Sequence, residues 1–301
     1  MEIDTLQGVQ LGGITQWIRV RGADTSNPVL LLMQQGPGLP IINDARRPEH
    51  LLGLEKAFTV VYWDQRGTGL SSPSLGTNPD RFEMSVARMV DDTVTLLELL
   101  RDRFGGKTFV TGFSFGATYA AYAAMRRPEL MAALVAAGVD IDVAAAEDNA
   151  YAFALDAASR RGNRRAIRQV EAIGPPPHTT VKQFNTRARW VANFGGLATN
   201  ANLNSMLRAL LFSLVSSPDY STLDVIRTLR GMSASQAALL PQLATTDLVR
   251  TVPRLEVPLV MAQGRLDQVA RDAAQRFHAS VTAPIKRLVW FEASRSASWA
   301  D

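Results

Sequence analysis

The stretch TFVTGFSFGATYA, residues 108–120, constrains the fold more than any other part of the chain. It opens like a short buried strand (108–112), passes through G-F-S-F-G (112–116) and continues as a helix of small residues. The glycines allow a sharp turn that leaves the Ser114 hydroxyl free at the start of this helix, where backbone N–H groups can bind an oxyanion. The alternative is a glycine-rich turn whose serine only caps the helix.

Strands and helices alternate at both ends of the chain, which predicts an α/β fold with a mostly parallel sheet and helices on both faces. Strand patterns occur at residues 14–22, 28–33, 58–63, 108–112, 131–139, 258–263 and 286–291, and helix patterns at 84–104, 114–127 and 269–280. Residues 142–251 lack strand signals. We therefore expect a core made of residues 1–141 and 252–301, with residues 142–251 as a helical lid over the carboxyl edge of the sheet.

Composition narrows the classes of function. The chain has no cysteine, which excludes disulfides, thiolate nucleophiles and cysteine-based metal sites. It has no P-loop, dinucleotide-binding motif or metal-ligand cluster, so we expect no cofactor and no metal. The net charge is +4, but the basic residues are scattered, which favours helix surfaces over a nucleic-acid site. The polar N-terminus and the lack of a long apolar run predict a cytoplasmic protein with a small-molecule substrate and no membrane partner.

Four stretches together identify a family resemblance: NPVLLLMQQGPG (27–38), FTVVYWDQRGTGLSS (58–72), TGFSFG (111–116), and VPLVMAQGRLD (257–267) with KRLVWFEAS (286–294). They resemble the α/β-hydrolase superfamily and, within it, the proline iminopeptidase-like branch. The resemblance implies the α/β-hydrolase fold with an inserted lid. The segment DQR (64–66) is expected to fix its loop through an arginine–carboxylate pair.

The resemblance also implies roles for individual residues. Ser114 occupies the position of the nucleophile, and Asp267, just past a strand, occupies that of the triad acid. The backbone N–H groups of Gln35 and Phe115 occupy the oxyanion-hole positions.

The chain departs from the branch wherever a histidine is expected. Gln34 and Gln35 stand in a segment that usually reads HGGPG, and Phe113 replaces the histidine before the nucleophile. Leu266 stands in a segment that is commonly GRHD, and Ser296 occupies the position of the triad base. Since a serine hydroxyl needs a neighbouring base to accept its proton, the triad is predicted to be degenerate.

Few groups could replace the missing base. Asp267 could act directly if burial raised its pKa. His50 and His278 are expected on helix surfaces, whereas His178, in the lid loop IGPPPHTT, could face the pocket. Gln34, Phe113, His178 and Trp190 are the predicted substrate-binding residues.

Three functions remain open from the sequence. The first is a non-hydrolytic reaction on a small carbonyl compound, such as a cyclisation, elimination or rearrangement in a biosynthetic pathway, in which the scaffold orients the substrate. The second is an ester or amide hydrolase that uses Ser114 with a displaced base. The third is a catalytically silent pseudoenzyme or an inactivated variant.

Overall fold

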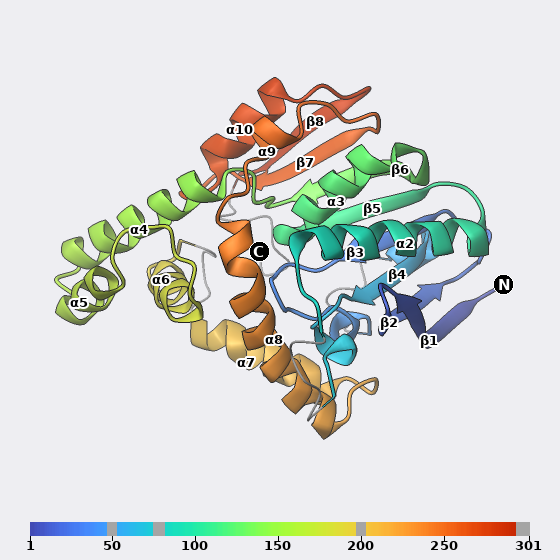
Figure 1. Cartoon of the computed structure of the whole chain (residues 1–301), viewed down its shortest axis with the longest axis horizontal. Coiled ribbons are helices and arrows are strands. Elements are labelled where there is room, and N and C mark those ends of the chain that lie inside the picture. The colour runs from blue at the N-terminus through green and yellow to red at the C-terminus, as the bar shows by residue number, and fades with distance from the viewer. Residues whose placement is uncertain (47–52, 75–81, 197–202, 293–301) are drawn as a thin grey trace.

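The computed structural model describes residues 1–46, 53–74, 82–196 and 203–292 of the chain (Figure 1). Its centre is an eight-stranded sheet in the order β1-β2-β4-β3-β5-β6-β7-β8. The strands are β1 (Ile3–Leu11), β2 (Ile14–Gly22), β3 (Val29–Met33), β4 (Thr59–Asp64), β5 (Thr108–Phe113), β6 (Met131–Ala137), β7 (Leu259–Gly264) and β8 (Lys286–Phe291). The strands from β4 to β8 run parallel, and β1 and β2 join them antiparallel. This confirms the predicted α/β class.

The central strands bury both of their faces. In β3, Leu31 and Met33 belong to the larger core, whereas Leu30 and Leu32 belong to a second core on the opposite face. This division follows from the two-residue period of a strand. It explains why PVLLLM is continuously apolar in the sequence: a parallel strand covered on both sides needs apolar residues at every position.

Helices cover the sheet and extend beyond it. They are α1 (Leu54–Ala57), α2 (Val86–Phe104), α3 (Phe115–Arg126), α4 (Val143–Arg160), α5 (Arg164–Ile173), α6 (Val181–Asn193), α7 (Leu203–Ser216), α8 (Thr222–Leu243), α9 (Leu248–Thr251) and α10 (Arg271–Ser280). Short 3-10 turns occur at Ile42–Asp44, Gly69–Ser71 and Pro128–Leu130. Within the described residues, no helix is long and apolar enough to cross a membrane.

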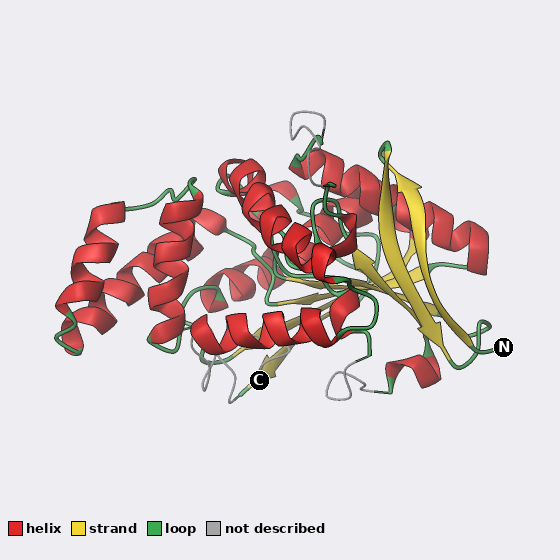
Figure 2. Ribbon diagram, turned by 90° about the horizontal axis from the view of Figure 1, so that it is seen from below, coloured by secondary structure: helices red, strands yellow, loops and turns green. Residues whose placement is uncertain are grey.

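The helices between β6 and β7 form two groups. Figures 1 and 2 show α4, α5 and α6 projecting from one end of the molecule, and they bury a small core of their own. Helix α8 instead packs on loops of the α/β core: a Cβ atom on Gly38 would lie 2.7 Å from the Cα atom of Met232, and one on Gly67 2.7 Å from the Ser235 hydroxyl. Glycine at these positions therefore permits the close approach of α8 to the core.

Candidate active site

Ser114 lies in a strained turn between β5 and α3. Its φ angle is 51°, and it is the one residue other than glycine with a positive φ in the described part of the chain. A Cβ atom on Gly112 would lie 2.5 Å from the Cα atom of Ala117, and one on Gly116 2.4 Å from the carbonyl oxygen of Gln34. The two flanking glycines are thus required by close backbone contacts. Strain of this kind at a serine is typical of a nucleophile presented above a sheet.

The hydrogen-bond acceptor of the Ser114 hydroxyl in this structure is a carboxylate. The Ser114 hydroxyl donates a hydrogen bond to Oδ2 of Asp140 over 2.5 Å. Asp140 lies three residues beyond β6, the strand next to β5 in the sheet. The loop is held in place because the Thr118 hydroxyl, on α3, donates to the Asp140 carbonyl over 2.9 Å. Asp140 therefore supplies a base position that the sequence analysis did not identify.

The surroundings of Asp140 favour its neutral form. The pKa of this carboxyl is raised to about 6, mainly by burial and also by the negative charge of Asp267; the hydrogen bond from Ser114 and the positive charge of Arg187 act in the opposite direction. A carboxyl group with a pKa near 6 is mostly ionised at neutral pH and can still accept and return a proton. Asp140 therefore has the protonation chemistry of a general base.

Asp267 is occupied by structural hydrogen bonds. Its Oδ1 accepts from the backbone N–H groups of Val269 (2.7 Å) and Ala270 (2.9 Å), and its Oδ2 accepts from the side chain of Gln263 (2.7 Å). Burial raises its pKa, and these bonds lower it. Asp267 acts on Ser114 only indirectly, through its charge on Asp140. The direct Asp267–Ser114 pair considered from the sequence is not formed in this structure.

The predicted oxyanion donors remain free. Phe115 is the first residue of α3, and neither its backbone N–H nor that of Gln35 has a hydrogen-bond partner among the described residues. Gln35 is partly exposed, whereas Gln34 is buried and donates from Nε2 to Oε1 of Gln65 over 3.0 Å. Gln34 and Phe115 also line a small pocket beneath the loop 36–38. Two unpaired N–H groups near an elbow serine can stabilise a developing negative charge.

The remaining predicted site residues are dispersed. Phe113 ends β5 next to Ser114, but His178 is fully buried inside the lid. The backbone N–H of His178 donates to Glu147 over 2.9 Å, and its Nε2 lies 3.0 Å from the Gly174 carbonyl oxygen. Trp190 stacks on Phe194 in the lid core, with ring centroids 5.4 Å apart. His178 and Trp190 thus pack within the lid.

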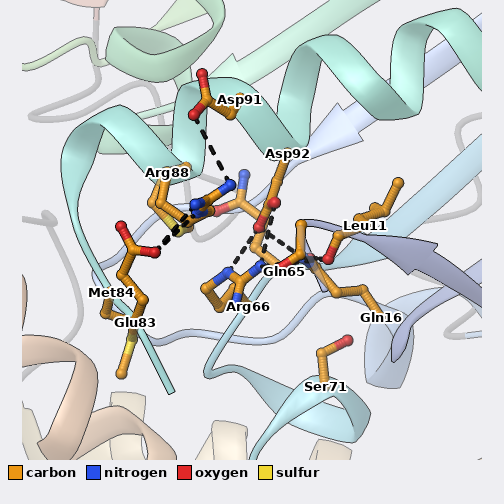
Figure 3. A network of polar contacts seen from close by, with 12 residues as sticks. Leu11, Gln16, Gln65, Arg66, Ser71, Glu83, Met84, Arg88, Asp91 and Asp92 are labelled. Carbon is orange, nitrogen blue, oxygen red and sulfur yellow. Dashed lines mark hydrogen bonds and ion pairs between the residues drawn. The ribbon is translucent and has the colours of Figure 1, made fainter. Parts of the chain in front are cut away.

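The segment at residues 64–66 fixes its loop as expected. Arg66 is buried and pairs with Asp92 of α2 over 2.7 Å, and its Nη2 donates to the carbonyls of Leu11 and Gly12 (Figure 3). Asp64 accepts from the backbone of Ile41 and from the hydroxyl of Tyr220, just before α8. The segment therefore ties the sheet both to α2 and to the lid.

Two residues of the sequence analysis lie outside the described residues. Ser296, at the position of the triad base, is one of them, and His50 is the other. The degenerate triad therefore remains a prediction. Within the described part of the chain, no group of acidic residues and histidines could hold a metal ion.

Comparisons with known proteins agree with the fold. A family model described as "alpha/beta hydrolase fold" matches residues 28–172. The chain is 26% identical over 297 residues to the probable aminopeptidase YbaC of Bacillus subtilis (strain 168), in an alignment that covers 98% of this chain and 91% of that protein.

Solved structures show the same architecture. The proline iminopeptidase-related protein of Thermus thermophilus superimposes with a TM-score of 0.63 at 18% identity, covering 99% of this chain and 92% of that one. The 2-hydroxy-6-oxo-6-phenylhexa-2,4-dienoate hydrolase of a Rhodococcus species gives a TM-score of 0.61 at 19% identity, covering 100% and 94%. With its sheet order and elbow, the chain has the α/β-hydrolase fold.

Proposed function

We propose that the protein is a serine hydrolase that cleaves an ester or amide bond of a small molecule, with Ser114 as nucleophile and Asp140 as its proton acceptor. The observation that carries the proposal is the 2.5 Å hydrogen bond from the Ser114 hydroxyl to Asp140 at a strained elbow. A nucleophile bonded to a base is the usual signature of covalent catalysis.

The proposed reaction has two stages. Oγ of Ser114 attacks the substrate carbonyl carbon while its proton passes to Asp140, and the backbone N–H groups of Phe115 and Gln35 bind the oxyanion. Asp140 then gives the proton to the leaving alcohol or amine as its bond to carbon breaks, which leaves an acyl group on Ser114. A water molecule attacks this acyl group, its proton passes to Asp140 and then to Oγ of Ser114, and the acid product departs.

The names of two similar proteins are consistent with hydrolysis. The Bacillus protein is named a probable aminopeptidase, and the Rhodococcus protein is named a hydrolase. Substrates with a free amine are therefore the first to test. Ester substrates belong in the same test, because they require less help for the leaving group and report a weak base more sensitively.

The second candidate is a non-hydrolytic cyclisation, elimination or rearrangement. It is supported by the same carboxylate, because Asp140 could move a proton on a bound carbonyl compound while Ser114 only orients that compound. The two candidates differ in their need for the serine oxygen: hydrolysis requires an acyl-enzyme, whereas the second reaction does not.

The test is labelling with a fluorophosphonate probe, read by intact-protein mass and peptide mapping, alongside hydrolysis of p-nitrophenyl esters and aminoacyl p-nitroanilides. We expect one adduct, on Ser114, and loss of both labelling and hydrolysis in Ser114→Ala. Ser26→Ala, in an exposed turn, is the matched control and should behave as the wild type. An unlabelled wild-type protein that does not hydrolyse these substrates would contradict the proposal.

A further inference from the structure

The outer surface of the lid carries a concentration of apolar side chains. Seven large apolar residues on α7 and α8 are exposed, more than half of those that are exposed in the described part of the chain. They are Leu207 (43%), Leu211 (41%), Phe212 (68%), Val215 (72%), Leu223 (42%), Ile226 (44%) and Leu229 (44%). We call this set the lid patch. A large exposed patch of apolar side chains is often an interaction site.

The exposure is not a sign that the two helices lack a packed face. On α7, Leu210 and Leu214 pack into the core cluster that contains Ile41, Ile42 and Tyr62, and the Ser213 hydroxyl accepts a hydrogen bond from Asn43 over 2.6 Å. On α8, Val225 packs into the same cluster. Each helix thus has an apolar inner face that packs against the core and a second apolar face that is exposed.

The spacing places the exposed residues on one side of each helix. Leu207, Leu211 and Val215 recur every four residues of α7, and Leu223, Ile226 and Leu229 recur every three residues of α8. Such spacing aligns side chains along one face. Figure 1 shows α7 and the start of α8 at the lower edge of the molecule, away from β6, β7 and α10, whereas the rest of α8 runs toward the centre.

The charges interspersed with the lid patch are positive. Arg208 follows Leu207 directly, Arg230 follows Leu229, and both are exposed. Neither has an ion-pair partner among the described residues, and the one acid of the two helices, Asp224, pairs with Arg227 over 3.3 Å. The surface is therefore an apolar face carrying two unneutralised guanidinium groups, a combination that favours the headgroup region of an anionic bilayer.

A second copy of this chain fits the lid patch less well. In a two-fold dimer the same patch would face itself, so that Arg208 and Arg230 of one subunit would meet those of the other with no unpaired acid of either helix to offset them. Anionic lipid headgroups supply the missing negative charge, and long arginine side chains can reach them while the apolar residues insert between the lipids.

We propose that the outer faces of α7 and α8 dock the protein peripherally on an anionic lipid surface. This departs from the expectation of no membrane partner that the sequence suggested. The proposal is independent of the reaction at Ser114, since none of the residues of the lid patch belongs to that site.

The experiment is co-sedimentation of the full chain with vesicles of phosphatidylcholine alone or with added phosphatidylglycerol. We expect binding to the anionic vesicles that weakens with salt, and little binding to the neutral ones. Replacing Phe212 and Val215 together by serine should lower the partition coefficient by about tenfold or more. Replacing Arg208 and Arg230 by glutamine should lower it by about twenty-five-fold, roughly fivefold for each charge.

Matched controls separate the lid patch from general effects. Met125→Ser removes an exposed apolar side chain from α3, outside the lid patch, and glutamine at Arg164 and Arg165 removes two exposed charges from α5. Both variants should bind vesicles as the wild type does, and circular dichroism checks that every variant is folded. Equal loss in the controls, or no vesicle binding by the wild type, would overturn the proposal. So would a dimer in light scattering that the Phe212 and Val215 replacements dissociate, because the occupant would then be a second copy.

Discussion

Strands β6 and β7 are neighbours in the parallel sheet, and each is followed, three residues beyond its end, by an aspartate whose pKa is raised by burial. After β7, Asp267 accepts three hydrogen bonds from its own segment and from Gln263. After β6, Asp140 accepts from Ser114. The two acids thus have similar positions at the sheet edge but different hydrogen-bond partners. Asp267 stabilises its own loop, whereas Asp140 contacts Ser114.

The difference shows that position in a fold does not by itself assign a catalytic role. The hydrogen bonds to Asp267 stabilise its charge and occupy its lone pairs, although burial still raises its pKa above the usual value. A carboxylate that is buried with a single hydroxyl partner has a raised pKa and remains reactive. The hydrogen-bond partners, rather than the strand that precedes each acid, distinguish Asp140 from Asp267.

The largest expected effect comes from removing each carboxylate in turn. Asp140→Asn keeps the shape of the side chain but cannot accept the serine proton, so kcat/KM should fall about a thousandfold. Asp267→Asn should lower kcat/KM by less than about tenfold, because Asp267 does not touch Ser114. Steady-state kinetics on an activated ester compare the two. Equal losses of kcat/KM in both variants would contradict the different roles given to Asp140 and Asp267.

Replacing the two acids should change the stability of the protein in opposite directions. Asp267→Ala leaves the backbone N–H groups of Val269 and Ala270 without their acceptor and should lower the free energy of unfolding by about 1–2 kcal/mol. Asp140→Asn should stabilise the protein, because it removes an ionised group from a buried site. Thermal unfolding measures both changes.

The stabilisation expected from Asp140→Asn depends on pH. The pKa of Asp140 is raised from 3.8 to about 6 in the folded chain, so the cost of its charge is absent below the unfolded value, grows between the two values and is complete above pH 6. The gain of Asp140→Asn over the wild type should grow over the same range. A gain that is already complete below the unfolded pKa would contradict this explanation.

The pH profile of activity gives a smaller and more specific effect. Because Asp140 must be ionised to accept a proton, kcat/KM should rise with pH through an apparent pKa of about 6. Asp267→Asn removes a negative charge that raises this pKa and should move the acid limb to lower pH. If the acid limb of the profile does not move in Asp267→Asn, the carboxylates of Asp140 and Asp267 are not electrostatically coupled.

The smallest expected effect comes from the lid. The positive charge of Arg187 lowers the pKa of Asp140, so Arg187→Gln should move the acid limb to higher pH, opposite to Asp267→Asn. Arg187 also pairs with Glu147 over 3.2 Å, so the double variant with Glu147→Gln controls for the broken ion pair. Shifts in the same direction for Arg187→Gln and Asp267→Asn would contradict the assignment.

Local sequence patterns predicted the parallel part of the sheet and the elbow because these depend on short-range chemistry. Apolar runs marked β3 to β8, and the glycines around Ser114 marked the turn that close contacts with Ala117 and Gln34 require. Strand β1 was not predicted, since Gly8 and several polar residues interrupt the apolar pattern of Ile3–Leu11 and its pairing with β2 is antiparallel at the edge of the sheet.

The proton acceptor could not be identified from the sequence because its identity depends on strand order. Asp140 closes the run MAALVAAGVD, and an acid just after a strand is a usable signal. Only the placement of β6 beside β5 brings it to Ser114. His178 shows the converse: its loop suggested a place facing the pocket, whereas the fold buries it beside Glu147 and Tyr151.

The rate of phosphonylation of Ser114 as a function of pH, in the wild type and in Asp140→Asn, tests most directly whether Asp140 activates the nucleophile. The account predicts a wild-type rate that rises through a pKa of about 6 and a variant rate lower by about a thousandfold, with no such rise. A variant that is labelled as fast as the wild type across the pH range would contradict it.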